Sequence, residues 1–409
     1  MDDELLVDLG NSYTPSIIKV IGVGGGGGNA VGKMYRDAIP EVRYLVCNTD
    51  SKALEDSPVP DRLQLGPGLG VGGDPEKGRD FAEKYVDKIR QEFDDNTKMV
   101  FVTAGMGGGT GTGVSPVLAR EARAKGILTV GVVTIPFRFE RTRQIDKALD
   151  GLETLAKEVD ALLVINNQRL LDIYPTESVI EAFDHADEAL STAVSSIIHI
   201  ISMRGRMNLD FADVEKVLSN GGVAVMSTGY GQGDNRLRQA IHNALYSPLV
   251  NNNDIFRATR MVMSITSNDQ EFPLRMEELH EVEDFMARFD EGIEAKYGLD
   301  FDSSLDDSLK VVILASGFSL FPENESPDKG VVFKVGSTPE TADRVEKLSR
   351  RRGRFYPSDN KLTGGAPSNF YIFSPDDLTD ECVAEAVAGT PTGTRSYNEW
   401  TRIRRIAGH

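Results

Sequence analysis

The residues with the clearest chemical potential are glycines and threonines that follow a short apolar run. Residues 103–113 read Thr-Ala-Gly-Met-Gly-Gly-Gly-Thr-Gly-Thr-Gly, between an expected strand over residues 99–102 and an expected helix over residues 114–124. A glycine-rich turn in this position points several backbone N–H groups at one place, and the positive end of the helix dipole reinforces them. Thr110 and Thr112 add hydroxyl donors without bulk. The stretch therefore predicts a turn that binds phosphate groups, such as those of a nucleotide.

Two further glycine-rich turns strengthen this prediction. Residues 24–30 follow an expected strand over residues 17–23 and precede a helix from about Val31, and residues 66–75 precede an expected helix over residues 75–93. A single turn of this kind is weak evidence, because glycines also serve ordinary tight turns. Three such loops that converge are better explained by a bound polyphosphate than by three unrelated tight turns.

Two common nucleotide motifs fit the first loop incompletely. The Gly-x4-Gly-Lys pattern at residues 27–33 resembles a P-loop, but Met34 stands where Ser or Thr must reach magnesium. The Gly-x-Gly-x-x-Gly pattern at residues 22–27 satisfies the dinucleotide fingerprint, and Asp50 follows at the distance of a ribose-binding acid. A nicotinamide-dependent oxidoreductase is therefore an alternative, although it leaves two glycine loops without a role and no His or Lys as an evident partner for hydride transfer.

Composition narrows the class of protein. The chain has 409 residues, 40% apolar and 26% charged, and its 45 Lys+Arg against 63 Asp+Glu give a net charge of −18. The length predicts two domains with tails, and the negative charge argues against nucleic acid as a partner. The cysteines, Cys47 and Cys382, form no disulfide framework, the N-terminus is acidic, and no apolar run approaches the ~20 residues of a membrane span. We expect a cytoplasmic protein without direct membrane insertion.

The order of apolar runs predicts the architecture that positions the glycine loops. Strands are expected over residues 17–23, 43–48, 99–102, 128–133 and 161–165, with helices between them that include residues 75–93 and 146–158. Such alternation indicates a parallel sheet covered by helices on both faces, with ligands beyond the carboxyl ends of its strands. A long helix over residues 184–206 with an apolar stripe is expected next, either between two domains or in the core of one. A second α/β unit is expected over strands 224–229, 260–265 and 310–316 and helices 236–245 and 277–289.

At this point the sequence resembles a known family. Residues 107–113 resemble the signature of the tubulin/FtsZ family of GTPases, and residues 24–30, 48–50, 70–75, 136–140 and 208–214 resemble further stretches of that family in the same order. The resemblance implies an α/β fold: a Rossmann-like GTPase domain with a parallel sheet, a long central helix and a smaller α/β C-terminal domain. It implies these boundaries: an N-terminal extension over 1–14, the GTP-binding domain over 15–183, the central helix over 184–206, the C-terminal domain over 207–319, and a linker and C-terminal peptide of uncertain order over 320–409.

The resemblance also implies a function. It implies a GTPase of the bacterial division ring that assembles head to tail into filaments, hydrolyses GTP to GDP where two subunits meet, and holds Mg²⁺ through the nucleotide phosphates rather than through side chains. A head-to-tail contact that does not close gives a filament. The alternative from another class is a scaffold that binds GTP without significant turnover. The implied location is the cytoplasm at mid-cell.

Motif positions within the family assign the nucleotide contacts. The phosphates are expected at Gly25, Gly26, Gly27, Gly28, Asn29, Gly72, Gly73, Gly108, Gly109, Thr110 and Gly111. Glu140 is expected to contact the ribose and Phe183 to pack against the base. Asn167 and Asp187 are expected to read guanine, because a carboxylate accepts from both its ring N–H and its amino group. Without the family, the favoured interpretation would be a surface acid on a helix for Asp187 and a core aromatic for Phe183.

One position departs from the family pattern. The family has a basic residue four positions after the Phe-Glu pair that ends at Glu140, facing the nucleotide, and this chain has Gln144 there. Arg143 lies one residue earlier, within a helical turn of Glu140, and is the expected substitute. Which of the two faces the nucleotide stays open.

The hydrolytic residues are expected in the loop before a helix over residues 214–218. Asp210 and Asp213 form an Asp-x-x-Asp pair, which is also a good N-cap for a helix. In the family, this loop of one subunit enters the nucleotide site of the next, its acids position the attacking water, and Asn208 supports them. Phosphoryl transfer asks the protein mainly for placement and charge compensation, so two carboxylates near a magnesium-bound triphosphate suffice.

The C-terminal end carries one further hypothesis. Pro391 to Arg405 only loosely resembles the family's C-terminal peptide, and Trp400 and Ile403 are spaced for one helical face among arginines. We expect this stretch to bind a membrane adaptor protein of the division ring. The alternative is a solvated tail.

Overall fold

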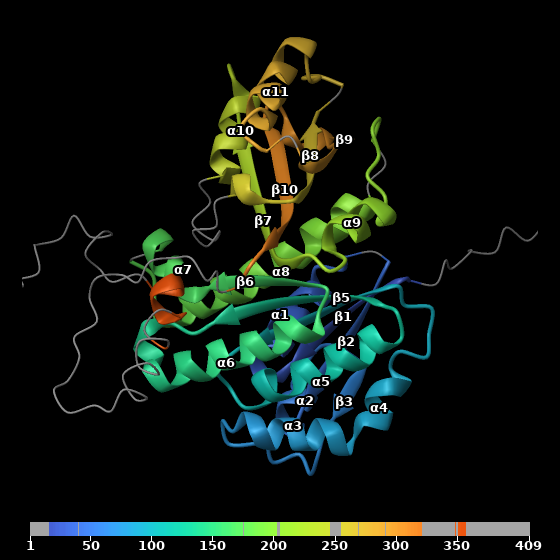
Figure 1. Cartoon of the computed structure of the whole chain (residues 1–409), viewed down its shortest axis with the longest axis vertical. Helices are drawn as coiled ribbons and strands as arrows, with labels where there is room; N and C mark the ends of the chain where they lie inside the picture. The colour runs from blue at the N-terminus through green and yellow to red at the C-terminus, as the bar shows by residue number, and fades with distance from the viewer. Residues whose placement is uncertain are drawn as a thin grey trace, which may run out of the picture. The chain divides into compact units, whose positions relative to one another are not determined.

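A ten-stranded sheet runs through the part of the chain that the structure describes, in the order β3-β2-β1-β4-β5-β6-β7-β10-β8-β9 (Figure 1). The structure is a computed structural model, and it describes residues 16–39, 41–174, 176–202, 205–245, 255–268, 270–290, 292–320, 348 and 351–356. The sequence-based domain boundaries at 14 and 409 therefore lie outside the described residues, as does the stretch from Pro391 to Arg405.

The first six strands pair in parallel, as the alternation of apolar runs predicts. They are β1 (Ile18–Val23), β2 (Val42–Asn48), β3 (Arg62–Gln64), β4 (Met99–Gly105), β5 (Leu128–Ile135) and β6 (Ala161–Asn166). Every residue of β1, β5 and β6 is buried, as is typical of a parallel sheet with both faces covered. The sequence analysis missed β3, because a three-residue edge strand has too few positions to show a period.

Eight α-helices lie between or after these six strands in the described residues up to Ser202. They are α1 (Gly24–Arg36), α2 (Ser51–Glu55), α3 (Pro75–Lys84), α4 (Val86–Gln91), α5 (Thr110–Ala124), α6 (Thr142–Glu158), α7 (Asn167–Ile173) and α8 (Val179–Ser202). The single helix expected over residues 75–93 is broken at Tyr85, whose backbone leaves the helical region. The expected starts at Val31 and Val114 are wrong: α1 and α5 begin within the glycine loops, at Gly24 and Thr110.

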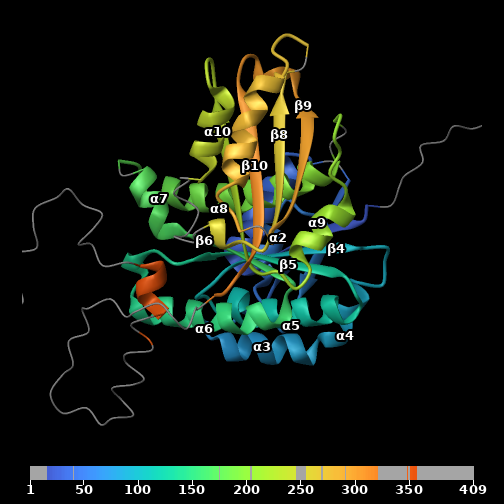
Figure 2. The same cartoon turned by 45° about the horizontal axis from the view of Figure 1, so that its top comes forward.

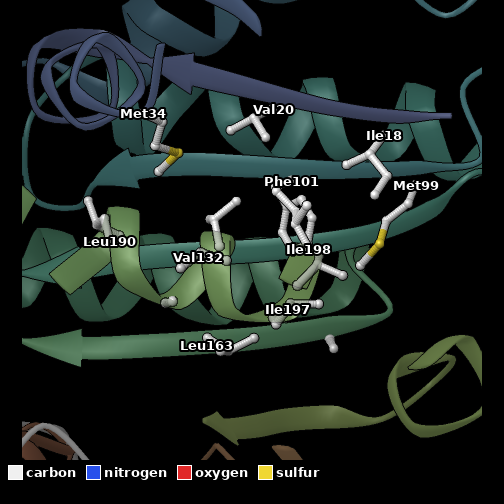
Figure 3. Packing of buried hydrophobic residues seen from close by; sticks show 14 of the residues in the cluster. Ile18, Val20, Met34, Met99, Phe101, Val132, Leu163, Leu190, Ile197 and Ile198 are labelled. Atoms are coloured by element: carbon white, nitrogen blue, oxygen red, sulfur yellow. The ribbon is translucent and has the colours of Figure 1, made fainter. Parts of the chain in front are cut away.

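Two hydrophobic clusters cover opposite faces of the sheet. Because side chains alternate along a strand, Val20 points to one cluster and Ile21 to the other. α8 packs with α1 on the first face, where Leu190, Ile197 and Ile198 lie over the sheet near Val132 and Leu163 (Figure 3). α3, α4, α5 and α6 cover the second face (Figure 2).

The C-terminal unit continues the same sheet. Its elements are α9 (Phe211–Leu218), β7 (Gly222–Gly231), α10 (Arg236–Leu245), β8 (Arg260–Ser267), a 3₁₀ turn (Met276–Leu279), α11 (His280–Met286), β9 (Glu294–Phe301) and β10 (Leu309–Phe318). β7 pairs with β6 in parallel, and β10 pairs antiparallel with both β7 and β8. The helix expected over residues 277–289 is a 3₁₀ turn followed by a short α-helix. The sequence analysis missed β9, although Ala295, Tyr297, Leu299 and Phe301 alternate along it with polar residues or glycine, as in a half-buried strand.

A short helical segment beyond the C-terminal unit packs on the sheet's second cluster. Residues 351–356, which the sequence analysis assigned to a linker, bury Phe355 and Tyr356 there. Local sequence favoured a solvated segment, since four of the six residues are arginine or glycine. The burial depends on contacts with residues far away in the chain.

Candidate nucleotide site

The three glycine loops meet in space. Gly24 of the first loop approaches the third so closely that an added Cβ would lie 2.9 Å from the backbone nitrogen of Gly111. Gly109 of the third loop approaches the second, where its Cβ would lie 2.5 Å from the Val71 side chain. The hydroxyls of Thr49 and Thr110 share a hydrogen bond of 2.7 Å, which ties the end of β2 to the start of α5.

All but one of the predicted phosphate glycines fall into two groups; the exception is Gly26, where a Cβ would lie in ordinary contact, 3.6 Å from Gly105. At Gly27, Gly109 and Gly111 a Cβ would collide with neighbouring protein atoms, so these glycines allow the loops to pack. Around Gly25, Gly28 and Gly108 a Cβ would meet no atom of the described residues within 4 Å, and Gly72 and Gly73 are equally open at positive φ. The open group provides bare backbone facing free space, which suits a phosphate chain.

Two of the three helices that follow glycine loops begin without a side-chain cap. The residues before α1 and α5, Val23 and Gly109, make no side-chain hydrogen bond to the first turn. The first N–H groups of a helix have no partner within the helix, and its dipole is positive there. An anion is a fitting partner for these two helix starts.

Alanine at Gly27 and alanine at Gly28 should have different effects. A Cβ at Gly27 would lie 2.2 Å from the carbonyl oxygen of Thr103. Gly27→Ala should therefore lower the free energy of unfolding by about 3 kcal/mol. Gly28→Ala should leave stability undiminished and weaken nucleotide binding, because its methyl group points into the open phosphate path. Urea unfolding and a nucleotide titration check both variants, and tight binding by Gly28→Ala would contradict the assigned path.

Asp187 on α8 lies at a cavity of about 770 Å³ beside the first loop. Gly25, Gly28 and Asn29 also line this cavity. Burial raises the pKa of Asp187 to about 7; the nearby charge of Asp184 adds to the rise, while Lys33 and a hydrogen bond from Asn29 oppose it. A carboxyl group with these surroundings gains from a ligand that donates hydrogen bonds to it.

A small apolar cluster positions the remaining base-side residues. Phe137, Leu170 of α7, and Ala182 and Ala186 of α8 form it, so the 3₁₀ turn Arg138–Glu140 and two helix starts are held together. A hydrogen bond of 2.9 Å from the backbone N–H of Arg138 to Gln168 adds a tie between the turn and α7.

Three predicted contacts project from this cluster. The Oδ1 atom of Asn167 is buried and has no hydrogen-bond partner among the described residues, as expected of a group that binds a ligand. The Phe183 ring is 42% exposed and meets Phe137 edge-on at 5.2 Å, so one face is left for a base. Glu140 accepts from the N–H of Phe137 at 2.9 Å, and burial raises its pKa.

The structure offers a cation at the second loop that the sequence analysis missed. Arg143 is exposed, whereas Gln144 backs onto the third loop, with its carbonyl oxygen 3.0 Å from where a Cβ of Gly107 would be. Lys147 donates to the carbonyl oxygen of Gly73 at 2.6 Å. The sequence feature that could have predicted this contact is the position of Lys147, a basic residue one helical turn after Arg143 on the same face of α6.

Asp50 has another partner than the oxidoreductase alternative requires. Its Oδ1 accepts from the N–H of Lys52 at 3.0 Å and caps α2. The carboxylate that would bind a nicotinamide ribose is therefore engaged in local structure.

The acids predicted to act in hydrolysis lie far from these loops. Asp210 and Asp213 cap α9 reciprocally, each accepting from the other's N–H at 3.0 Å, and Lys296 of β9 pairs with Asp213 at 2.5 Å. Asn208 supports the loop by accepting from the N–H of Gly205 at 2.7 Å. These acids therefore do cap a helix, the structural role that their Asp-x-x-Asp spacing also predicted.

Two distances separate the acids from the glycine loops. α8 extends about 22 Å from Asp187 to its last residue, Ser202, and the acids follow that end. β9, to which Lys296 ties Asp213, lies six strand spacings from β4, which corresponds to about 29 Å along the sheet. One molecule therefore keeps its glycine loops and its paired acids apart.

The described residues hold neither a cluster of metal ligands nor a membrane-spanning helix. No group of three His, Cys, Asp or Glu side chains there is arranged to hold a metal ion. No helix in the same residues is long and apolar enough to cross a membrane.

Comparisons with known proteins agree with the geometry. A model of the tubulin/FtsZ family GTPase domain matches residues 17–175, and a model of the FtsZ family C-terminal domain matches residues 222–319. The cell division protein FtsZ of Porphyromonas gingivalis is 51% identical over 99% of this chain and 91% of its own length. The cell division protein FtsZ of Aquifex aeolicus is 40% identical over 78% of this chain and 88% of its own length.

A solved structure shares the fold. The structure described as "FtsZ dimer, empty (M. jannaschii)" has a TM-score of 0.68 and 34% identity, covering 75% of this chain and 89% of that one. The resemblance expected from the glycine signature is confirmed, and the oxidoreductase alternative is excluded. The chain belongs to the FtsZ family within the tubulin/FtsZ GTPases.

Proposed function

We propose that this chain hydrolyses GTP where two copies meet head to tail, one copy holding the nucleotide and the next supplying Asp210 and Asp213. The observation that carries the proposal is the separation of the acids from the glycine loops along α8 and across the sheet. A site split in this way is completed only by a neighbour. Assembly then switches hydrolysis on.

The family fixes the coarser part of this function. The chain is a GTPase of the bacterial division cytoskeleton that binds guanine nucleotide and associates with itself. The relative from M. jannaschii is described as a dimer. We propose the finer part, an open filament, because a head-to-tail contact that does not close repeats without limit.

The proposed roles of individual residues follow from their surroundings. The two uncapped helix starts and the open glycines bind the phosphates, and Lys147 adds a positive charge at Gly73. A magnesium ion suits phosphate oxygens and water as ligands, so we place it on the nucleotide. There it neutralises charge between the phosphate groups.

Asp213 is suited to act as a charged group. Burial raises its pKa, but the hydrogen bond from Lys296, the N–H of Asp210 and the charge of Lys296 together hold the pKa below its ordinary value. The carboxylate is therefore ionised at neutral pH. It can accept a hydrogen bond from a water molecule and orient that water toward a neighbour's γ-phosphate.

Phosphate release measured across protein concentrations tests the proposed function. Turnover per molecule should be very low in dilute, monomeric protein and should rise steeply once light scattering shows assembly. Equal turnover per molecule in monomeric and assembled protein would overturn hydrolysis between subunits. GTP-dependent assembly without phosphate release at any concentration would favour the scaffold alternative instead.

Guanine nucleotide affinity should depend on pH through Asp187. The carboxyl group has a raised pKa of about 7 in the free protein, and guanine needs the ionised form. Affinity should therefore fall as pH drops through 7, being about tenfold lower at pH 6 than at pH 8. Binding at the two pH values by calorimetry checks this, with Asp187→Asn as the control for titration of the phosphates. An equal pH effect in that variant would contradict the role of Asp187.

We also propose where the chain acts and what it meets there. An adaptor protein bound between Pro391 and Arg405 would hold filaments at the mid-cell membrane, consistent with the division-protein name of the relatives. A pull-down of membrane-associated division proteins with this peptide tests the idea. Unchanged recovery by a peptide with Trp400→Ala and Ile403→Ala would refute the expected helical face.

A further inference from the structure

Residues 351–356 dock against the two loops that carry the base-side contacts. The hydroxyl of Tyr356 donates to the carbonyl oxygen of Pro136 at 2.6 Å. The side-chain amide of Asn166 donates to the carbonyl oxygen of Phe355. Pro136 immediately precedes the Phe137–Glu140 turn, and Asn166 immediately precedes Asn167 at the start of α7. The segment therefore contacts the chain just before each of these two elements.

The docked aromatic rings are part of the core. Phe355 is 3% exposed and Tyr356 is 7% exposed, and both belong to the cluster that α5 and α6 form with the sheet. Buried aromatic side chains remove about 150–250 Å² each from water. Burial, and secondarily the negative charge of Glu140, hold the pKa of Tyr356 well above its ordinary value. The phenol thus lies near the proposed ribose contact and stays protonated as a donor.

Arginines hold the same segment along α6. Arg352 makes a two-bond contact with Asp146, with both distances 2.6 Å. Arg351 pairs with Asp150 at 2.8 Å and with Glu153 at 3.3 Å. The three acids lie three to four residues apart, which places them on one face of the helix. Planar arginine–carboxylate pairs of this kind specify orientation as well as adding energy.

A further contact ties the segment to the end of the C-terminal unit. Arg354 donates to the carbonyl oxygen of Ser319 at 3.1 Å, just after β10. Leu320 packs against the same cluster as Phe355 and Tyr356. The chain therefore leaves the sheet and returns to the place where it left.

We propose that residues 351–356 form an intramolecular clip that fixes the Phe137–Glu140 turn and the start of α7, and so slows release of guanine nucleotide. The clip's effect on the nucleotide rests on the proposed contacts of Glu140 and Asn167. The clip residues, 351–356, are positioning residues, because they act through Pro136 and Asn166 rather than on the nucleotide. A partner that draws the C-terminal segment away would thereby loosen the site.

The rate of nucleotide release tests the clip. Full-length protein is loaded with a fluorescent GDP analogue, held dilute enough to stay monomeric, and chased with unlabelled GDP. Tyr356→Phe removes one hydrogen bond to a buried carbonyl and should speed release about fivefold, and Phe355→Ala should speed it more. The matched control is Tyr230→Phe, an exposed tyrosine on β7. Release at the wild-type rate from both clip variants would overturn the proposal.

Two additional measurements separate the clip from the nucleotide assignment. Amide hydrogen exchange of residues 137–140 in nucleotide-free protein should become faster in Phe355→Ala, and unchanged exchange would refute the clip whatever the ligand is. Arg352→Asp should also speed exchange, and adding Asp146→Arg should restore protection by re-forming the pair in reverse. If Phe355→Ala speeds exchange of residues 137–140 but the wild-type protein binds no guanine nucleotide, the clip is supported and the proposed function is refuted.

Discussion

Asp210→Asn and Asp213→Asn should each lower GTP turnover of assembled protein by about a hundredfold or more, while nucleotide binding stays at the wild-type level. Asparagine is the informative replacement, because it also caps helices and so keeps α9 in place, whereas alanine costs about 1 kcal/mol there. The separation of the acids from the glycine loops explains why binding should survive. Phosphate release and a nucleotide titration on the same preparations check both parts.

Mixing two inactive variants makes the test decisive. Asp210→Asn keeps its nucleotide site, and Asp187→Ala keeps its acids. If the acids act on the neighbouring subunit, the mixture should recover a substantial share of wild-type turnover, since some joints then pair an intact nucleotide site with intact acids. Asp302→Asn, a cap of another turn in the C-terminal unit, serves as the control and should remain active. A mixture no more active than its parts would contradict hydrolysis in trans.

The sheet and its order of loops were predictable because their signals are local. Runs such as Val20 to Val23 are buried on both faces and are continuously apolar, and the glycine loops at residues 24–30 and 103–113 follow such runs directly. The starts of α1 and α5 were not predictable, whereas those of α3 at Pro75 and α10 at Arg236 were. Glycine has a poor propensity for helix, yet α1 begins at Gly24, where the close approach to Gly111 leaves no room for a side chain. Tertiary packing overrode propensity.

The candidate site shows the same division. Convergence of three loops followed from the rule that ligands lie beyond the carboxyl ends of parallel strands. Lys147 and Lys296 were missed, since each acts on a residue more than seventy positions away in the chain. Docking of residues 351–356 was missed for the same reason. An arginine-rich stretch does not itself show that Arg352 binds Asp146 or that Tyr356 binds Pro136, since both partners are distant in the chain.

Asp187→Asn should exchange the base preference of the site from guanine to xanthine. The carboxylate of Asp187 can accept from both N–H groups on one edge of guanine, whereas asparagine offers one acceptor and one donor. Xanthine carries a carbonyl oxygen in place of the guanine amino group, so it matches the amide. GTP affinity should fall about a hundredfold through loss of a charge-assisted hydrogen bond, and xanthosine triphosphate should bind the variant more tightly than GTP does.

The switch in preference from guanine to xanthine distinguishes recognition of the base by Asp187 from a general effect of its charge. Asp184 is the matched control: it lies one turn earlier on α8, lines the same cavity and is exposed. Asp184→Asn removes the same charge from nearly the same place and should keep the preference for GTP, with slightly tighter binding because a negative charge near the phosphates is gone. Competition between the two triphosphates, followed by assembly in each, gives the answer. If Asp187→Asn loses GTP without gaining xanthosine triphosphate, then Asp187 does not face the base, and the orphaned oxygen of Asn167 becomes the main candidate for reading guanine.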